Sequence, residues 1–129
     1  MTNFKSYSGS CHCGAVRFRF RSEEITSGCR CNCSICIRKG AVMSAKYIPA
    51  GDFEELQGAD ALTVYRFGDQ DLDHCFCKIC GISPFSVVAR VPDSYDGPAK
   101  PGHRRVNLGC VDGVDPLGLT VTVLDGRSL

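Results

Sequence analysis

The sequence lacks an excess of charge of either sign, and it lacks any long hydrophobic run. Its 15 basic and 14 acidic residues give a formal net charge of +1, so nothing draws the chain toward a phosphate backbone or an anionic membrane surface. No apolar segment has the length of a membrane span or of a signal-peptide core. We therefore expect no nucleic-acid partner, no membrane partner and a cytoplasmic location, while no particular oligomeric state is favoured.

Helical periodicity is also scarce. Residues 34–39 are expected to form one short helix that ends at Gly40, and residues 52–56 a turn or two of helix. The Pro- and Gly-rich residues 92–102 predict an exposed loop, and the acidic residues 69–73 predict a solvated hairpin turn. Helices therefore cannot dominate the fold.

Alternation between apolar and polar residues is the main structural signal. It is clearest at residues 15–21, where Val16, Phe18 and Phe20 alternate with arginines, a pattern typical of a strand with one buried face. We therefore predict a mainly β fold of mostly antiparallel sheets, formed by one domain over residues 1–129. Weaker alternation predicts further strands at residues 62–67, 85–91, 106–110 and 119–124.

Cysteine is abundant, with ten residues, and in a reducing compartment this density indicates metal binding or catalysis rather than disulfides. Two close pairs, each followed directly by a glycine, lie far apart in the sequence. Together they supply four thiolates, the closed tetrahedral set of a structural zinc site. The alternative is that they are buried free cysteines. The pairs are Cys11 with Cys13 and Cys77 with Cys80.

A second run, Cys31, Cys33 and Cys36, supplies three thiolates from one short segment. Three protein ligands leave one position of a zinc ion open to water or substrate, which is typical of a reactive site. We thus expect two zinc ions per chain, one structural and one exchangeable. The alternative is a second closed site, in which Cys29 is the strongest fourth ligand because it shares the alternation of Cys31 and Cys33. The other rival ligands are Cys110, His74, His103 and His12.

The histidines are weak candidates for metal ligands. His12 and His74 are neighbours of cysteines, but the alternation that directs the cysteines inward directs these histidines the other way. His103 lies in the expected exposed loop region, where a histidine usually has no special role. We therefore expect no metal bond from them.

The three-thiolate run suits a soft ligand better than water. Three thiolates leave the metal centre negatively charged, so it acidifies bound water less than a three-histidine zinc site does. Such a site is suited to capturing a small thiol and holding it as a nucleophile. The basic residues Arg30, Arg38 and Lys39 flank the run and either bind the carboxylates of that ligand or are simply solvated.

Three motifs together resemble the glutathione-dependent formaldehyde-activating enzyme (GFA) family, which includes centromere protein V. They are Cys-His-Cys-Gly-Ala-Val-Arg-Phe from Cys11, Cys-Asn-Cys-Ser-Ile-Cys from Cys31, and Phe-Cys-Lys-Ile-Cys-Gly from Phe76. The resemblance implies an Mss4-like fold of β-sheets. It also implies a structural zinc on Cys11, Cys13, Cys77 and Cys80, and a catalytic zinc on Cys31, Cys33 and Cys36.

The resemblance implies a carbon–sulfur lyase that joins glutathione to formaldehyde as S-hydroxymethylglutathione. Our leading hypothesis is accordingly a zinc-dependent lyase that forms adducts between an aldehyde and glutathione or a related small thiol. One alternative is a non-catalytic, zinc-stabilised module that binds a protein partner. The other is a redox sensor with labile zinc, suggested by the surplus cysteines Cys29, Cys75 and Cys110, whose commonest role is nevertheless that of small buried hydrophobes.

Overall fold

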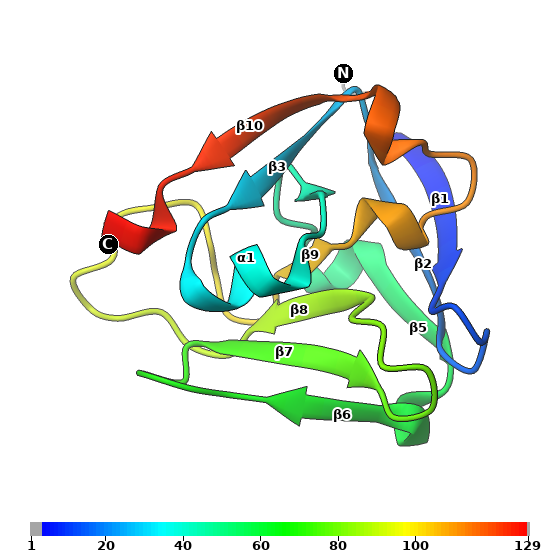
Figure 1. Ribbon diagram of the computed structural model, residues 1–129, viewed down its shortest axis with the longest axis horizontal. Coiled ribbons are helices and arrows are strands. Elements are labelled where there is room, and N and C mark those ends of the chain that lie inside the picture. Colours follow the sequence, from blue (N-terminus) through cyan, green and yellow to red (C-terminus); the bar gives the residue numbers. More distant parts are fainter. Residues whose placement is uncertain (1–3, 129) are drawn as a thin grey trace.

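A computed structural model describes residues 4–128 of the protein (Figure 1). Strands form two three-stranded sheets, in the orders β1-β2-β5 and β10-β3-β4, and one four-stranded sheet in the order β6-β7-β8-β9. The predicted mainly β fold with antiparallel sheets is therefore confirmed, although β3 and β10 pair in parallel. The strands are β1 (Phe4–Ser10), β2 (Arg17–Glu23), β3 (Ser27–Cys31), β4 (Met43–Ser44), β5 (Phe53–Gln57), β6 (Leu62–Tyr65), β7 (Leu72–Cys77), β8 (Phe85–Val88), β9 (Arg104–Val106) and β10 (Thr120–Leu124), with one α-helix, α1 (Ser34–Lys39).

Strand β2 carries the centre of the hydrophobic core. Phe18 and Phe20 are no more than 1% exposed, whereas the arginines between them face solvent, as the alternation predicts. The strand begins two residues later than expected. Ala15 and Val16 belong instead to a turn that is closed by a hydrogen bond from the Cys11 N–H to the Val16 carbonyl (3.1 Å).

The expected helix at residues 52–56 is wrong, because this segment forms strand β5 after a 3₁₀ turn at Ala50–Asp52. Strand β5 pairs with β2, and the Phe53 ring stacks on the Phe18 ring at a centroid distance of 5.5 Å. Burial of that ring against the core outweighs the weak local helix preference.

In the four-stranded sheet, the strands begin or end at residues other than those predicted. The chain turns between β6 and β7 near the acidic segment, as predicted, but Asp73 already lies in β7. The strand expected at residues 106–110 is largely wrong, since β9 ends at Val106 and Leu108–Cys110 form a 3₁₀ turn. The Asn107 side chain accepts a hydrogen bond from the Gly109 N–H (3.0 Å) and so favours the turn. The loop predicted at residues 92–102 contains no helix or strand.

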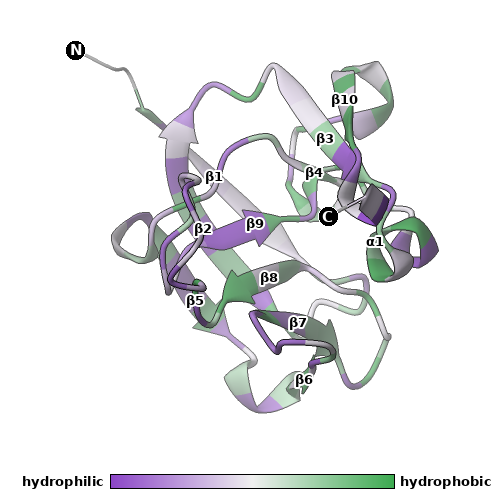
Figure 2. Cartoon of the chain, turned by 90° about the vertical axis from the view of Figure 1, so that its left-hand side faces the viewer, coloured by the Kyte–Doolittle hydropathy of each residue, from purple (hydrophilic) through white to green (hydrophobic). Residues whose placement is uncertain are grey.

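Helix α1 lies between the β3–β10 pair and the four-stranded sheet in both views (Figures 1 and 2). It spans the predicted residues and ends at Gly40, whose left-handed φ of 67° disfavours other residues. Gly40 N–H bonds to the Cys36 carbonyl (3.0 Å). Over residues 4–128, no helix has both the length and the hydrophobicity needed to cross a bilayer.

Candidate metal centres and the adjoining cavity

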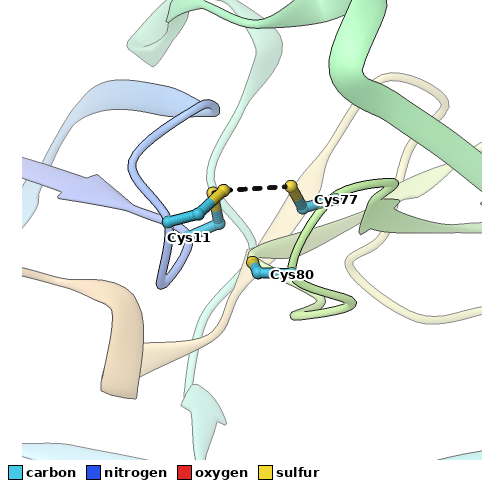
Figure 3. Close-up of side chains that lie close together, drawn as sticks. Cys11, Cys77 and Cys80 are labelled. Carbon is cyan, nitrogen blue, oxygen red and sulfur yellow. Dashed lines mark hydrogen bonds between the residues drawn. The ribbon is translucent and has the colours of Figure 1, made fainter.

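The two distant cysteine pairs come together in what we call the four-cysteine cluster, formed by Cys11, Cys13, Cys77 and Cys80. Their four Sγ atoms all lie within 4.8 Å of one another. Cys13 Sγ is 3.6 Å from the sulfurs of both Cys11 and Cys77. Figure 3 shows Cys11 on one loop and Cys77 and Cys80 on another, with their side chains pointing toward one another.

Both loops of the four-cysteine cluster are tight turns that require glycine. Gly14 and Gly81 have φ angles of 80° and 79°, which L-residues rarely adopt. Each glycine N–H closes its turn on a cysteine carbonyl, Gly14 on Cys11 (3.2 Å) and Gly81 on Cys77 (2.8 Å). The glycine that follows each cysteine pair therefore allows the chain to make the tight turn.

The electrostatics of the four-cysteine cluster favour a bound cation. Hydrogen bonds from the backbone N–H groups of Cys13 and Ile82 lower the pKa of the Cys80 thiol to about 6. The backbone N–H of Ala15 lowers the pKa of the Cys13 thiol, but desolvation and the adjacent sulfurs outweigh this effect and raise that pKa to about 11. Four thiolates this close together repel one another, so only a cation can stabilise them all. The donor set of four soft sulfurs fits Zn²⁺.

Cys31, Cys33 and Cys36 form what we call the three-cysteine cluster, and their Sγ atoms also lie within 4.8 Å of one another. Cys31 ends β3, Cys33 precedes the first residue of α1, and Cys36 lies one turn further on. The Cys33 N–H donates to Cys31 Sγ (3.4 Å). Burial and the neighbouring Cys33 raise the pKa of Cys36 to about 12. This cluster also fits a soft divalent cation, with one fewer sulfur.

The C-terminal residues hold the loop of the three-cysteine cluster in place, a contact that sequence reasoning missed. The Asn32 side chain donates to Asp125 Oδ1 (2.9 Å) and accepts from the Arg127 N–H (2.8 Å). Gly126 packs so closely on Cys31 that a Cβ at this position would collide with the Cys31 sulfur. No short-range pattern indicates a contact across 93 residues of sequence.

A cavity of about 530 Å³ opens beside the three-cysteine cluster. All three cysteines line it, whereas none of the four-cysteine cluster does. Most of the wall is apolar, so the cavity offers an incoming thiol mainly apolar contacts. The other lining residues are Cys29, Ala41, Met43, Leu72, Val88, Leu124 and Gly126, with the polar residues Lys39, Tyr47, His74, Ser86, Arg105 and Asp125.

His74 and Lys39 form a polar pair in the cavity wall. His74 points away from Cys77, as alternation along β7 requires, but it is buried (3% exposed) and faces the cavity of the other cluster. His74 therefore points away from its neighbouring cysteines, as the alternation predicts, but into the cavity of the other cluster. Lys39 Nζ lies 3.0 Å from His74 Nδ1. Burial and the Lys39 charge lower the pKa of His74 to about 4, so its neutral ring accepts a hydrogen bond from the Lys39 ammonium group.

None of the rival fourth ligands brings a donor atom into the three-sulfur group within the described residues. Cys29 lines the cavity but is buried, with its thiol 3.5 Å from the Ser44 carbonyl. Cys75 is buried as a small hydrophobe in the same way (5% exposed). His12 is exposed, and His103 accepts a hydrogen bond from the Lys100 N–H. Burial, together with the nearby Cys11 and Cys80 of the other cluster, raises the pKa of the Cys110 thiol to about 11.

The three basic residues that flank the cluster differ in position. The side chains of Arg30 and Arg38 are exposed and donate to the carbonyls of Gly40 (3.0 Å) and Ser34 (2.7 Å). Only Lys39 lines the cavity. Of the three, Lys39 is therefore the one placed to meet a ligand.

The fold and the two clusters define a small β protein with two cysteine groups that can hold metal ions, one of them beside a cavity. The family model for the glutathione-dependent formaldehyde-activating enzyme (GFA) matches residues 6–118. The chain belongs to this family, as the motifs indicate.

Two relatives support the assignment. A Halomonas elongata protein, provisionally named as a glutathione-dependent formaldehyde-activating enzyme, is 33% identical over 91 residues. The matched region is 66% of this chain and 58% of that protein, so the chain spans little more than half of its relative. The crystal structure of a Rhodobacter sphaeroides protein has a TM-score of 0.71 and 33% identity, and the match covers 89% of this chain and 99% of that one.

Proposed function

We propose that this protein is a zinc-dependent carbon–sulfur lyase that forms and cleaves adducts between a small thiol, such as glutathione, and an aldehyde, such as formaldehyde. The observation that carries the proposal is the three-cysteine cluster on the wall of a largely apolar cavity of about 530 Å³. The family's name supplies the two substrates.

The two clusters have different roles in this proposal. Cys11, Cys13, Cys77 and Cys80 hold a structural zinc ion, which joins the turn after β1 to the turn after β7. Cys31, Cys33 and Cys36 hold an exchangeable zinc ion, which when bound lowers the pKa of a coordinated thiol and keeps it as a nucleophile.

The cavity residues assist the addition. The sulfur of the thiol forms a bond to the carbonyl carbon, the π electrons move to the oxygen, and that oxygen takes up a proton from Lys39. The thiol releases its own proton to solvent, and solvent returns a proton to Lys39, so no net proton is gained or lost. Lys39, held by its hydrogen bond to neutral His74 (3.0 Å), stabilises the developing oxyanion and donates that proton. The largely apolar wall lowers the polarity around Lys39, which strengthens this electrostatic contribution.

Exchange spectroscopy tests the proposal, because the thiol–aldehyde addition also proceeds without an enzyme. Proton NMR measures the rate of exchange between free thiol and hydroxymethyl thioether, with and without catalytic amounts of the zinc-loaded protein. We expect faster exchange with the protein and no acceleration with the Cys31→Ser/Cys33→Ser/Cys36→Ser variant. Equal rates with both proteins, for glutathione and for smaller thiols, would contradict the proposal.

A non-catalytic protein-binding module is the second candidate, and one surface favours it. Tyr65 is 52% exposed and Phe67 is 43% exposed, and both line a shallow depression beside α1. Exposed aromatic side chains of this kind are typical of protein interfaces. A protein that fails the exchange test yet retains both metal ions would favour this function.

A further inference from the structure

Arg105 is a cation that the proposed chemistry leaves unused. It lies on β9 and lines the same cavity as the three-cysteine cluster. Its guanidinium carbon lies 4.2 Å from the centroid of the Tyr47 ring, a stacking contact that fixes its direction. Figure 2 shows the hydrophilic strand β9 next to the hydrophobic β8. The charge is thus held at an apolar wall.

No acidic group of residues 4–128 neutralises Arg105. Its Nε atom is buried and has no hydrogen-bond partner, and its guanidinium forms no ion pair within the described chain. The neighbouring Arg104 faces the other way and pairs with Glu55 (3.4 Å). A half-buried guanidinium with free donors is costly unless an anion binds it, and its planar fork matches a carboxylate.

The register of the sheet connects Arg105 to the proposed reaction site. Arg105 pairs with Ser86 on β8, and Ser86 pairs with His74 on β7. Residues directly opposite in a sheet point to the same face, and all three line the cavity. Because His74 holds Lys39, one polar row crosses the cavity wall from Arg105 to the helix that carries Cys36.

The cavity offers no comparable partner for an ammonium group. Asp125 is its only carboxylate among the described lining residues, and both Asp125 oxygens already accept hydrogen bonds, from Asn32 (2.9 Å) and from Ser128 (2.7 Å). Lys39 and Arg105 repel a third cation. Away from the cysteines, the cavity therefore offers cationic partners for a carboxylate and no unpaired carboxylate for an ammonium group.

We infer that the cavity selects thiols that carry a carboxylate, with the carboxylate bound by Arg105 and the thiol at the three-cysteine cluster. This inference rests on the proposed function and narrows its thiol substrate to thiols with a carboxylate, a class that includes glutathione. Arg105 is thus a specificity-determining residue that sequence spacing does not reveal, because it lies 69 positions beyond Cys36.

Three thiols of matched size test the inference on the zinc-loaded protein: 3-mercaptopropionate (anionic), 2-mercaptoethanol (neutral) and cysteamine (cationic). Calorimetry gives their dissociation constants, and propanoate, which has no thiol, probes the carboxylate site alone. We expect 3-mercaptopropionate to bind about 10- to 100-fold more tightly than 2-mercaptoethanol, as a charge-assisted hydrogen-bonded pair predicts. Cysteamine should bind most weakly.

The Arg105→Gln variant should abolish this preference, so that the three thiols bind with similar affinity and propanoate no longer binds. Arg105→Lys should restore part of the preference, since it keeps the charge but not the fork. Arg38→Gln, which removes an exposed arginine outside the cavity, should leave the preference intact. Zinc content and melting temperature show whether each variant is folded and loaded.

The outcomes separate the inference from the proposed function. Equal affinities for the three thiols in the unaltered protein, or an unchanged preference in Arg105→Gln, would overturn the inference even if thiol–aldehyde exchange is catalysed. Loss of zinc from Arg105→Gln would also overturn it, because Arg105 would then serve as a counterion of the thiolates. Arg105-dependent binding of propanoate without catalysed exchange would support the anion site and contradict the lyase.

Discussion

The two cysteine clusters use the same ligand atom in opposite settings. The four-cysteine cluster joins two glycine turns, whose cysteines Cys13 and Cys77 are 64 residues apart in sequence. Cys11 and Cys77 are at most 2% exposed, whereas Cys13 lies at the surface. The three-cysteine cluster comes from one continuous segment and borders a cavity of about 530 Å³. A metal at the first site crosslinks the chain, whereas a metal at the second is accessible to small molecules. The comparison teaches that, in the proposed function, the surroundings rather than the thiolates distinguish the structural site from the reactive one.

The largest effect is expected at the four-cysteine cluster. Cys77→Ser should lower the free energy of unfolding by more than about 4 kcal/mol, or prevent folding, because metal binding there is coupled to folding. Urea unfolding followed by circular dichroism measures this change. The matched control is Cys75→Ser, which alters a buried cysteine of the same strand outside the cluster and should cost only about 1–2 kcal/mol. If both variants lost the same unfolding free energy, Cys77 would contribute no more than an ordinary buried cysteine, which contradicts a structural metal at this cluster.

Removal of the three-cysteine cluster should affect activity rather than folding. The triple variant Cys31→Ser/Cys33→Ser/Cys36→Ser should lower kcat/KM for thiol–aldehyde exchange at least about 100-fold, with a loss of unfolding free energy below about 2 kcal/mol. Exchange kinetics and urea unfolding measure the two quantities. Cys29→Ser changes the strongest rival ligand and should leave the metal bound; loss of the metal from this variant would indicate a closed second site.

Substitution of Lys39 tests whether the cavity takes part in the chemistry or only binds the substrate. Lys39→Met should reduce kcat about 100-fold with little change in KM, because it removes a proton donor that acts in the transition state. Steady-state exchange rates at varied thiol concentration separate kcat from KM. Arg38→Met, on the same helix but outside the cavity, should behave like the unaltered protein. An equal kcat in the Lys39 and Arg38 variants would contradict this role.

The smallest effect is expected from crowding at the three-cysteine cluster. Gly126→Ala places a Cβ against the Cys31 sulfur, so it should weaken zinc binding at that cluster about tenfold, as other changes next to metal ligands do. Competition with a chelator measures the affinity. Gly51→Ala adds the same methyl group where nothing lies within 4 Å and should have no effect. If Gly126→Ala instead released the metal of the four-cysteine cluster, the two sites would not be independent.

The sequence predicts the elements with strong local signals. The alternation around Phe18 and Phe20, the glycine stop of α1 and the turns at Gly14 and Gly81 all depend on neighbouring residues, and the structure has each of them. The two cysteine pairs and the three-cysteine run follow from the same local spacing, whereas the joining of the two pairs is a contact across 64 residues. These features are predictable because short-range geometry determines them.

Features that depend on long-range contacts escaped prediction. Strand β5 forms because Phe53 meets the core of β2, and the 3₁₀ turn at Leu108–Cys110 forms because Asn107 caps it. His74 belongs to the cavity because β7 separates the two clusters, with Cys77 facing one and His74 the other. Alternation along one strand gives the face on which His74 lies, but it does not show which cluster that face meets, nor where Arg105 lies.

The central claim is that one cysteine cluster forms a structural metal site and the other an exchangeable one. Metal stoichiometry tests this claim most directly. Elemental analysis is made on the purified protein and on the Cys31→Ser/Cys33→Ser/Cys36→Ser variant, each before and after dialysis with a mercaptocarboxylate. We predict two zinc ions per chain, of which the triple variant loses one while remaining folded and the thiol makes the same one labile. A single zinc ion that persists in the variant and ignores the thiol would contradict the account.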